Sequence, residues 1–284
     1  MYSPADGSFS PFQPQAGRVF ALGLTYADHI RETGEKAGKP AIFMKECRPE
    51  VSPSSVSTPE AGPMLAAISK IDSALAGWLA QRFEALPALL DYEVELGMVL
   101  LEDCSATALA TAAGMPRVGF FLANDITARS VQIAGQGSAR RMDFWAASKS
   151  LPGFLPVSAQ VWCPATPSAN KLPDITIKTL VNGEVRQSAP TRNIIYSPLQ
   201  LLQFACQAAG DRCLHRGDLV LTGTPAGVAL SVPRWKRLLG TVLPRRTVID
   251  KAISGSIANP AFLRPGDTVQ VTADWLGSFS LNIR

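Results

Sequence analysis

Short apolar runs dominate the chain from residue 88 onward and predict β-strands separated by turn residues. Asn182-Gly183 stands between two such runs, which predicts a two-residue hairpin. We expect strands near residues 18–22, 89–101, 117–124, 174–181, 184–188, 217–223, 267–274 and 277–283. Many short strands with few helices predict a β-rich α+β fold built on a barrel or sandwich.

Two stretches have helical periodicity instead. Apolar residues recur at spacings of three and four over residues 63–86, which predicts one long helix. Ser197 before Pro198, with a periodic stretch that ends at Gly210, predicts a capped helix. Residues 1–17 are rich in Pro, Gly, Ser and Gln, and we expect them to form a flexible arm.

Composition narrows the class of protein. With 284 residues and 46% hydrophobic residues, the chain is long enough for one large domain, which we expect over residues 18–284. No apolar run reaches transmembrane length, and residues 1–6 have no secretory-signal pattern, so we expect no membrane partner. Five cysteines without a C-x-x-C motif favour a reducing, cytoplasmic location.

The net charge of +4 is concentrated in one stretch. Residues 231–264 hold seven basic residues and a single acid, Asp250. Such a stretch can bind nucleic acid, but no recognised motif accompanies it, and we expect no nucleic-acid partner. A solvated surface insertion is the better interpretation, and the alternative is that part of it faces an anionic substrate.

Three carboxylates lie in apolar, strand-like surroundings. Glu93 and Glu95 are two residues apart, so a strand would project them from one face. Asp125 ends a second apolar run. Buried together, these acids would repel one another unless a cation lay between them, and all-oxygen ligation favours Mg²⁺, Mn²⁺ or Ca²⁺ over Zn²⁺. The structural alternative is an ordinary pair of acids on the solvent face of a strand.

His29 and Glu32 form a second candidate group. They are three residues apart, so a helical turn would place them on one face. A carboxylate beside an imidazole fixes one tautomer and raises its basicity, so that the pair can take a proton from water. The alternative is an incidental ion pair on a surface helix.

Seven short segments, taken in order, resemble the fumarylacetoacetate hydrolase family. The resemblance covers residues 18–284 and is carried by residues 23–32, 91–96, 123–129, 149–156, 181–187, 221–228 and 263–267. It implies the β-roll catalytic fold of that family, with a lid over about 24–38, and a homodimer. The helical stretch over 63–86 and the insertion over 231–264 would be elaborations of that fold.

The resemblance also implies a reaction and a set of site residues. Family members split or rearrange small 2-oxo acids that chelate a divalent cation through their carbonyl and carboxylate oxygens. We therefore expect a Mg²⁺- or Mn²⁺-dependent hydrolase that cleaves a C–C bond in a fumarylacetoacetate- or acylpyruvate-like acid. The implied residues are His29, Glu32 and Lys149 for catalysis, Glu93, Glu95 and Asp125 for the metal, and Tyr26, Arg129, Gln132 and Thr224 for the substrate.

Some departures from the family pattern leave the substrate open. Ser130 stands where an acid often follows the arginine, Thr25 replaces the usual Asn, and the loop after Gly227 is long. A decarboxylase, isomerase or hydratase of a 2-oxo acid would carry nearly the same residues. A degenerate member that only binds a ligand is a further alternative, which the intact candidate residues argue against.

Overall fold

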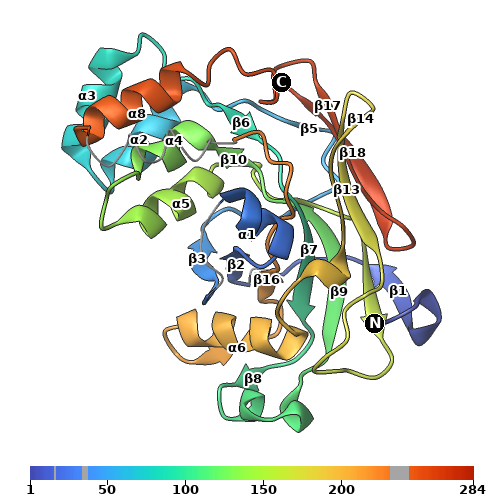
Figure 1. Cartoon of the computed structure of the whole chain (residues 1–284). Helices are drawn as coiled ribbons and strands as arrows, with labels where there is room; N and C mark the ends of the chain where they lie inside the picture. Colours follow the sequence, from blue (N-terminus) through green and yellow to red (C-terminus); the bar gives the residue numbers. More distant parts are fainter. Residues whose placement is uncertain (16, 34–37, 231–242) are drawn as a thin grey trace.

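The computed structural model describes residues 1–15, 17–33, 38–230 and 243–284. Two β-sheets form the body of the fold, and most helices gather on one side of it (Figure 1). The expected β-rich α+β fold is confirmed, and the predicted strands are present within a few residues of their expected bounds.

The larger sheet carries the centre of the core. Its main strands run in the order β1 (Gly7–Pro11), β12 (Gln160–Pro164), β9 (Val118–Asn124), β7 (Val94–Leu100), β16 (Leu219–Leu221), β2 (Val19–Gly23) and β3 (Ala41–Lys45). The short strands β11 (Pro156–Val157) and β4 (Glu50–Val51) continue from β9. Every residue of β7 and β9 is buried, as continuous apolar runs predict for central strands.

The second sheet runs in the order β14 (Glu184–Pro190), β13 (Thr176–Val181), β17 (Thr268–Ala273), β18 (Gly277–Ile283) and β5 (Ser55–Val56). Asn182 (φ 52°) and Gly183 (φ 83°) join β13 to β14. Positive φ at both positions is what a two-residue hairpin turn requires, so the hairpin prediction is confirmed. Two short antiparallel pairs complete the strands: β6 (Leu90–Asp91) with β10 (Thr127–Ala128), and β8 (Cys104–Ser105) with β15 (Cys213–Leu214).

The described helices include α1 (Ala27–Thr33), α4 (Arg129–Ala134), α5 (Arg141–Lys149) and α6 (Pro198–Ala208). Short 3₁₀ turns occur at Pro4–Asp6, Ala108–Ala110, Ala112–Gly114 and Thr191–Asn193. The capped helix predicted after Ser197 is α6, and the Ser197 hydroxyl accepts a hydrogen bond from the Gln200 amide at 3.3 Å.

The single long helix predicted over 63–86 is wrong, because the chain forms two helices there, α2 (Ala61–Ser69) and α3 (Ser73–Arg82). Asp72 separates them with an extended backbone, and its carboxylate accepts a hydrogen bond from the Leu75 amide at 2.9 Å. Met64 and Leu79 are both fully buried, so the apolar spacing continues across the break. An N-cap signal at Asp72 therefore overrides the periodicity.

The flexible arm predicted over 1–17 is also wrong for most of its length. Strand β1 pairs antiparallel with β12, and Tyr2 and Phe12 are buried at each side of it. The Tyr2 ring packs on Trp162 with 5.4 Å between ring centroids. A composition rich in Pro and Gly concealed an edge strand, a place where proline is tolerated.

Residues 231–242 of the basic insertion and residues 34–37 of the predicted lid lie outside the described residues. The described part of the insertion forms α8 (Arg245–Ser254), which lies across the α2–α3–α4 group in Figure 1. Its Ile249 and Ile253 are fully buried, and Arg245 donates to the backbone oxygens of Gln136 and Ala134. This part is a surface helix with one buried face, and its basic residues Arg246 and Lys251 remain exposed.

Across the described ranges, we find no helix with the length and apolar character needed to cross a membrane.

Candidate active site

The three predicted metal ligands meet where two central strands pair. Glu95 is the second residue of β7, Glu93 precedes that strand, and Asp125 directly follows β9. β7 and β9 are antiparallel with Glu95 opposite Ala123, and the Asp125 amide donates to the Glu93 backbone oxygen at 2.8 Å. One carboxylate oxygen of each acid lies within 4.8 Å of the others. The pairing register therefore builds the acidic triad.

Burial makes the triad costly, and three cations offset the cost. Glu93, Glu95 and Asp125 are 6%, 2% and 1% exposed. Lys149 Nζ donates to Glu93 Oε2 and to Asp125 Oδ2, each at 2.7 Å, and to Thr127 Oγ1 at 2.8 Å. A buried carboxylate is tolerated when it is paired and hydrogen-bonded, and Lys149 is such a partner for Glu93 and for Asp125.

The other two cations are Arg129 and Lys45. Arg129 Nη2 donates to Glu93 Oε1 at 2.5 Å. Lys45 is the last residue of β3, its side chain is fully buried, and its ammonium contacts Asp125 Oδ1 and, at 3.0 Å, the Phe154 backbone oxygen. Both oxygens of Glu93 and both of Asp125 therefore have a cationic partner.

Glu95 differs from the other two acids. Its Oε2 accepts a hydrogen bond from the Gly223 amide at 2.7 Å, and no cationic side chain among the described residues pairs with it. Burial raises the pKa of Glu95 well above its ordinary value, and the charge of Asp125 raises it further. Burial would also raise the pKa of Glu93, but Lys149 and Arg129 outweigh burial and lower it to about 2. Glu95 is thus the acid that most needs another positive charge.

The donor set fits a hard divalent cation. Three buried carboxylates with converging oxygens give an all-oxygen site, which Mg²⁺, Mn²⁺ and Ca²⁺ prefer. Glu95 is a buried carboxylate with an unmet need for positive charge, and a bound cation supplies it. The residues present therefore fit the group that the sequence predicts.

His29 and Glu32 are brought together as predicted. Helix α1 carries both, and His29 Nδ1 lies 3.1 Å from Glu32 Oε2. The Glu32 carboxylate also accepts the Gly227 amide at 3.3 Å, while Gly223, four residues earlier, donates to Glu95. The His29 charge is a minor contributor to the lowered pKa of Glu93. One turn, residues 223–227, therefore connects the imidazole–carboxylate pair to the triad.

Two predicted substrate contacts are buried beside the triad. Tyr26 is fully buried, its hydroxyl has no hydrogen-bond partner among the described residues, and burial raises its pKa, with a smaller contribution from the Glu95 charge. Thr224 Oγ1 donates to the Val94 oxygen at 3.1 Å and accepts from Gln187 Nε2 at 2.9 Å. The Tyr26 hydroxyl is left for a ligand, whereas the Thr224 hydroxyl is used within the fold.

Arg129 and Gln132 form one unit on α4. Arg129 is 4% exposed, and its Nη1 donates to Gln132 Oε1 at 2.6 Å. Its Nε donates to Asp91 Oδ2 at 2.7 Å. The third nitrogen of the guanidinium binds Glu93, so Arg129 supports a predicted metal ligand. The Gln132 amide nitrogen has no hydrogen bond to any part of the chain that the structure describes.

Sequence reasoning missed four residues that support the site: Lys45, Asp91, Asn124 and Gln187. Asn124 Oδ1 accepts the Glu93 amide at 3.0 Å, and Gln187 Oε1 accepts the Val94 amide at 3.0 Å, so the backbone on both sides of the Glu93–Val94 bond is fixed. Segments that carry the family resemblance contain Asp91, Asn124 and Gln187, and this position was the only hint in the sequence that they support the site. Lys45 lies in a strand that the sequence did not predict.

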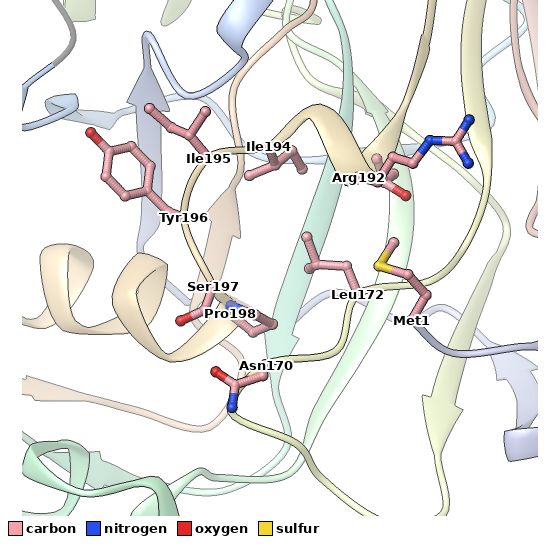
Figure 2. A pocket seen from close by; sticks show the side chains of 10 residues that line it. Met1, Asn170, Leu172, Arg192, Ile194, Ile195, Tyr196, Ser197 and Pro198 are labelled. Atoms are coloured by element: carbon pink, nitrogen blue, oxygen red, sulfur yellow. The ribbon is translucent and has the colours of Figure 1, made fainter.

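A separate cavity of about 270 Å³ lies beside the segment that leads into α6 (Figure 2). Ile194, Ile195 and Tyr196 line it, and its lining residues within the described chain include no acid and no histidine. The same segment contacts both ends of the stretch predicted as a lid. The Ile195 amide donates to the Thr25 oxygen at 2.9 Å, and the Tyr196 hydroxyl contacts the Gly38 oxygen. The described lining of the cavity therefore has no carboxylate or imidazole for a metal site or for acid–base chemistry.

Comparison with known sequences gives consistent results. The family pattern described as fumarylacetoacetate (FAA) hydrolase C-terminal matches residues 18–284. The chain is 31% identical over 226 residues to the human mitochondrial oxaloacetate tautomerase FAHD1, which covers 79% of this chain and 86% of that protein. It is 26% identical over 291 residues to the oxaloacetate tautomerase YisK of Bacillus subtilis, covering 100% of this chain and 75% of that protein.

Solved structures share the fold at lower identity. A fumarylpyruvate hydrolase from Pseudomonas aeruginosa, solved with Mn²⁺ and pyruvate, superposes with a TM-score of 0.61 at 20% identity, covering 100% of this chain and 98% of that chain. A 5-carboxymethyl-2-hydroxymuconate delta-isomerase from Mycobacterium smegmatis gives a TM-score of 0.58 at 22% identity, covering 97% and 78%.

Proposed function

Because this chain belongs to the fumarylacetoacetate hydrolase family, we propose that it is a divalent-metal-dependent hydrolase of a small acylpyruvate-like 2-oxo acid. The proposal includes cleavage of the C–C bond between the acyl group and the pyruvate part of the substrate. One observation carries it: the turn 223–227 joins the His29–Glu32 pair to the buried triad. The same turn thus contacts the proposed proton acceptor pair and the proposed cation site.

Charge balance supports an anionic substrate. The buried charged side chains of the described site are Asp91, Glu93, Glu95 and Asp125, opposed by Lys45, Arg129 and Lys149. Four negative and three positive charges leave −1 when all are ionised. A divalent cation changes this sum to +1, and one carboxylate of a 2-oxo acid then restores neutrality. Buried clusters are most stable near neutrality, so the full site favours an anion.

Glu93, Glu95 and Asp125 would hold the metal, and we propose Mg²⁺ or Mn²⁺ there. The fumarylpyruvate hydrolase with the same fold was solved with Mn²⁺. Such a cation supplies Lewis acidity to carbonyl oxygens when it is bound. Lys149, Lys45 and Arg129 orient Glu93 and Asp125, since each contacts at least one of these two carboxylates, and Glu95 is left for the cation. Three protein ligands leave coordination positions for substrate and water.

The His29–Glu32 pair would supply the base. His29 Nδ1–H donates to Glu32, which leaves Nε2 as the proton acceptor. His29 takes a proton from water, and the hydroxide formed adds to the distal acyl carbonyl. The bond from the acyl carbon to the neighbouring methylene then breaks, the electron pair becomes the enolate of pyruvate, and the proton held by His29 returns to the methylene carbon. A carboxylic acid and pyruvate leave.

Tyr26, Gln132 and Thr224 are proposed to line the substrate. The unpartnered Tyr26 hydroxyl and the Gln132 amide nitrogen are donors suited to substrate oxygens. Thr224 would act by holding the 223–227 turn in place, because its hydroxyl is engaged by Val94 and Gln187. Lys149 would contribute its positive charge to the developing enolate, while its ammonium donates to Glu93, Asp125 and Thr127.

A second candidate is keto–enol tautomerisation of oxaloacetate. The 31% identity to the human oxaloacetate tautomerase specifically favours it. Tautomerisation needs a base that moves a proton between carbon and oxygen, and His29 could serve there without activating water. The two reactions share a site and differ in whether a C–C bond breaks.

One assay separates the candidates. The metal-free protein, reloaded with Mg²⁺ or Mn²⁺, is given acylpyruvates and oxaloacetate while enol absorbance and pyruvate release are followed separately. The hydrolase proposal expects pyruvate in step with acylpyruvate loss. Loss of oxaloacetate enol absorbance without pyruvate release, together with no acylpyruvate turnover, would refute the hydrolase proposal and support a tautomerase. We also propose that the protein is a cytoplasmic homodimer. Gel filtration with light scattering measures the oligomeric state.

A further inference from the structure

We propose that Asp91 is a positioning residue that sets the Arg129 guanidinium for Glu93 and Gln132, an inference that rests on the proposed metal-dependent function. Asp91 is fully buried and touches none of the three predicted metal ligands. Its carboxylate accepts Arg129 Nε at 2.7 Å. Asp91 therefore acts on the triad indirectly, through the groups that it binds.

The geometry of Arg129 makes this indirect action effective. A guanidinium is planar and rigid, so fixing one nitrogen fixes the directions of the other two. With Nε on Asp91, Nη1 reaches Gln132 at 2.6 Å and Nη2 reaches Glu93 at 2.5 Å. The backbone cannot adjust independently, because Thr127 and Asp91 pair across β10 and β6. Rotation of the guanidinium would disturb a metal ligand and a substrate-side amide together.

Asp91 also joins the site to the loop that carries the Glu32 contact. Its oxygens accept the Ala229 amide at 2.9 Å and the Leu230 amide at 3.2 Å. These residues follow Gly227, whose amide donates to Glu32. One carboxylate thus fixes the support of Glu93 and the chain just beyond the 223–227 turn. A residue that only stabilised the fold would not need to bind both the arginine that supports Glu93 and the loop that follows the Glu32 contact.

The chain offers a matched control in Asp218. It is 2% exposed and accepts Arg18 Nε at 3.1 Å, Arg18 Nη2 at 2.7 Å and the backbone amides of Arg18 and His215, each at 2.9 Å. The chemistry is similar to that of Asp91: a buried Asp that accepts from an arginine and from backbone amides, two at Asp218 and three at Asp91 (Tyr92, Ala229 and Leu230). None of the Asp218 partners contacts the triad.

The test compares Asp91→Asn with Asp218→Asn in the metal-free full chain by calorimetric titration with Mn²⁺, beside the melting temperature. Loss of an outer-shell partner typically weakens metal affinity about 10- to 100-fold. We expect a loss in that range for Asp91→Asn, and a change under about threefold for Asp218→Asn, although both lower the melting temperature.

A second pair covers the case in which Asp91→Asn does not fold. Arg129→Lys removes the fixed fork and should weaken Mn²⁺ binding in the same range, whereas Arg18→Lys should not. The inference is overturned if, in a pair whose two variants both fold, the two variants bind Mn²⁺ equally well. Asp91 would then be a structural residue. Absence of Mn²⁺ binding by the unmodified protein would instead refute the proposed function.

Discussion

Replacing His29 with alanine tests the acid–base part of the account. The change deletes the imidazole whose Nδ1 lies 3.1 Å from Glu32 and leaves the triad contacts in place. Loss of a general base costs about 10²- to 10⁴-fold in rate, which corresponds to about 2.7–5.5 kcal/mol of transition-state stabilisation. We therefore expect kcat on an acylpyruvate to fall by that factor.

Stability should change far less than rate. The His29–Glu32 contact is a single i,i+3 pair on a seven-residue helix, with side chains 13% and 26% exposed. Such pairs contribute about 0.2–0.5 kcal/mol, which shifts the melting temperature of a chain of this size by about 1–2 °C. Metal affinity should change little, since His29 makes no hydrogen bond to a triad oxygen in the described contacts.

His215→Ala is the matched control. His215 is the other histidine of the chain, and its Nε2 lies 2.8 Å from Asp211 in an i,i+4 pair that is half exposed. The same deletion there should leave kcat unchanged. If His29→Ala and His215→Ala have the same kcat on a substrate that the unmodified protein hydrolyses, His29 is a surface residue and the base must be sought elsewhere. If His29→Ala instead loses Mn²⁺, His29 is a ligand.

Three further predictions follow from the site. Chelation should lower the melting temperature by about 5–10 °C relative to protein with metal at a hundred times Kd, which contributes about 2.7 kcal/mol, and scanning calorimetry with and without added Mn²⁺ measures the difference. In metal-free protein, the folded pKa of Glu95 lies above its ordinary 4.5, so its contribution to stability is present below that value and lost as pH rises through the folded pKa. Glu95→Gln should therefore flatten the fall in melting temperature as pH rises above 4.5, and an unchanged slope would contradict the burial argument. Replacing residues 231–242 with a short linker should change the ratio of kcat/KM for short and bulky 2-oxo acids by a contact worth about 1–3 kcal/mol, whereas an unchanged ratio would assign the insertion to packing or assembly.

Local signals account for what the sequence predicted well. The spacing of Glu93 and Glu95 places both acids near the start of β7, and Asn182-Gly183 has the positive φ values of its turn. The i,i+3 spacing of His29 and Glu32 survives as a contact on α1. Each of these depends on neighbours within a few residues, which a sequence displays directly.

Long-range contacts account for what it did not predict. Lys45 meets Asp125 across 80 residues of chain, and nothing in its own surroundings distinguishes it from a surface lysine. Arg129 was expected to hold substrate, but Asp91 and Glu93, which precede it by 38 and 36 residues, engage its guanidinium. The break between α2 and α3 depends on a capping contact of Asp72 that the uninterrupted apolar spacing concealed.

The most direct test of the central claim is the rate of acylpyruvate hydrolysis, measured as pyruvate released, while metal-free protein is titrated with Mn²⁺. The account predicts no turnover without metal, saturation near one Mn²⁺ per chain, and no recovery in Glu95→Gln, whose ligand set is incomplete. Full pyruvate release by protein verified to be metal-free, or by Glu95→Gln at the same Mn²⁺ concentration, would contradict it.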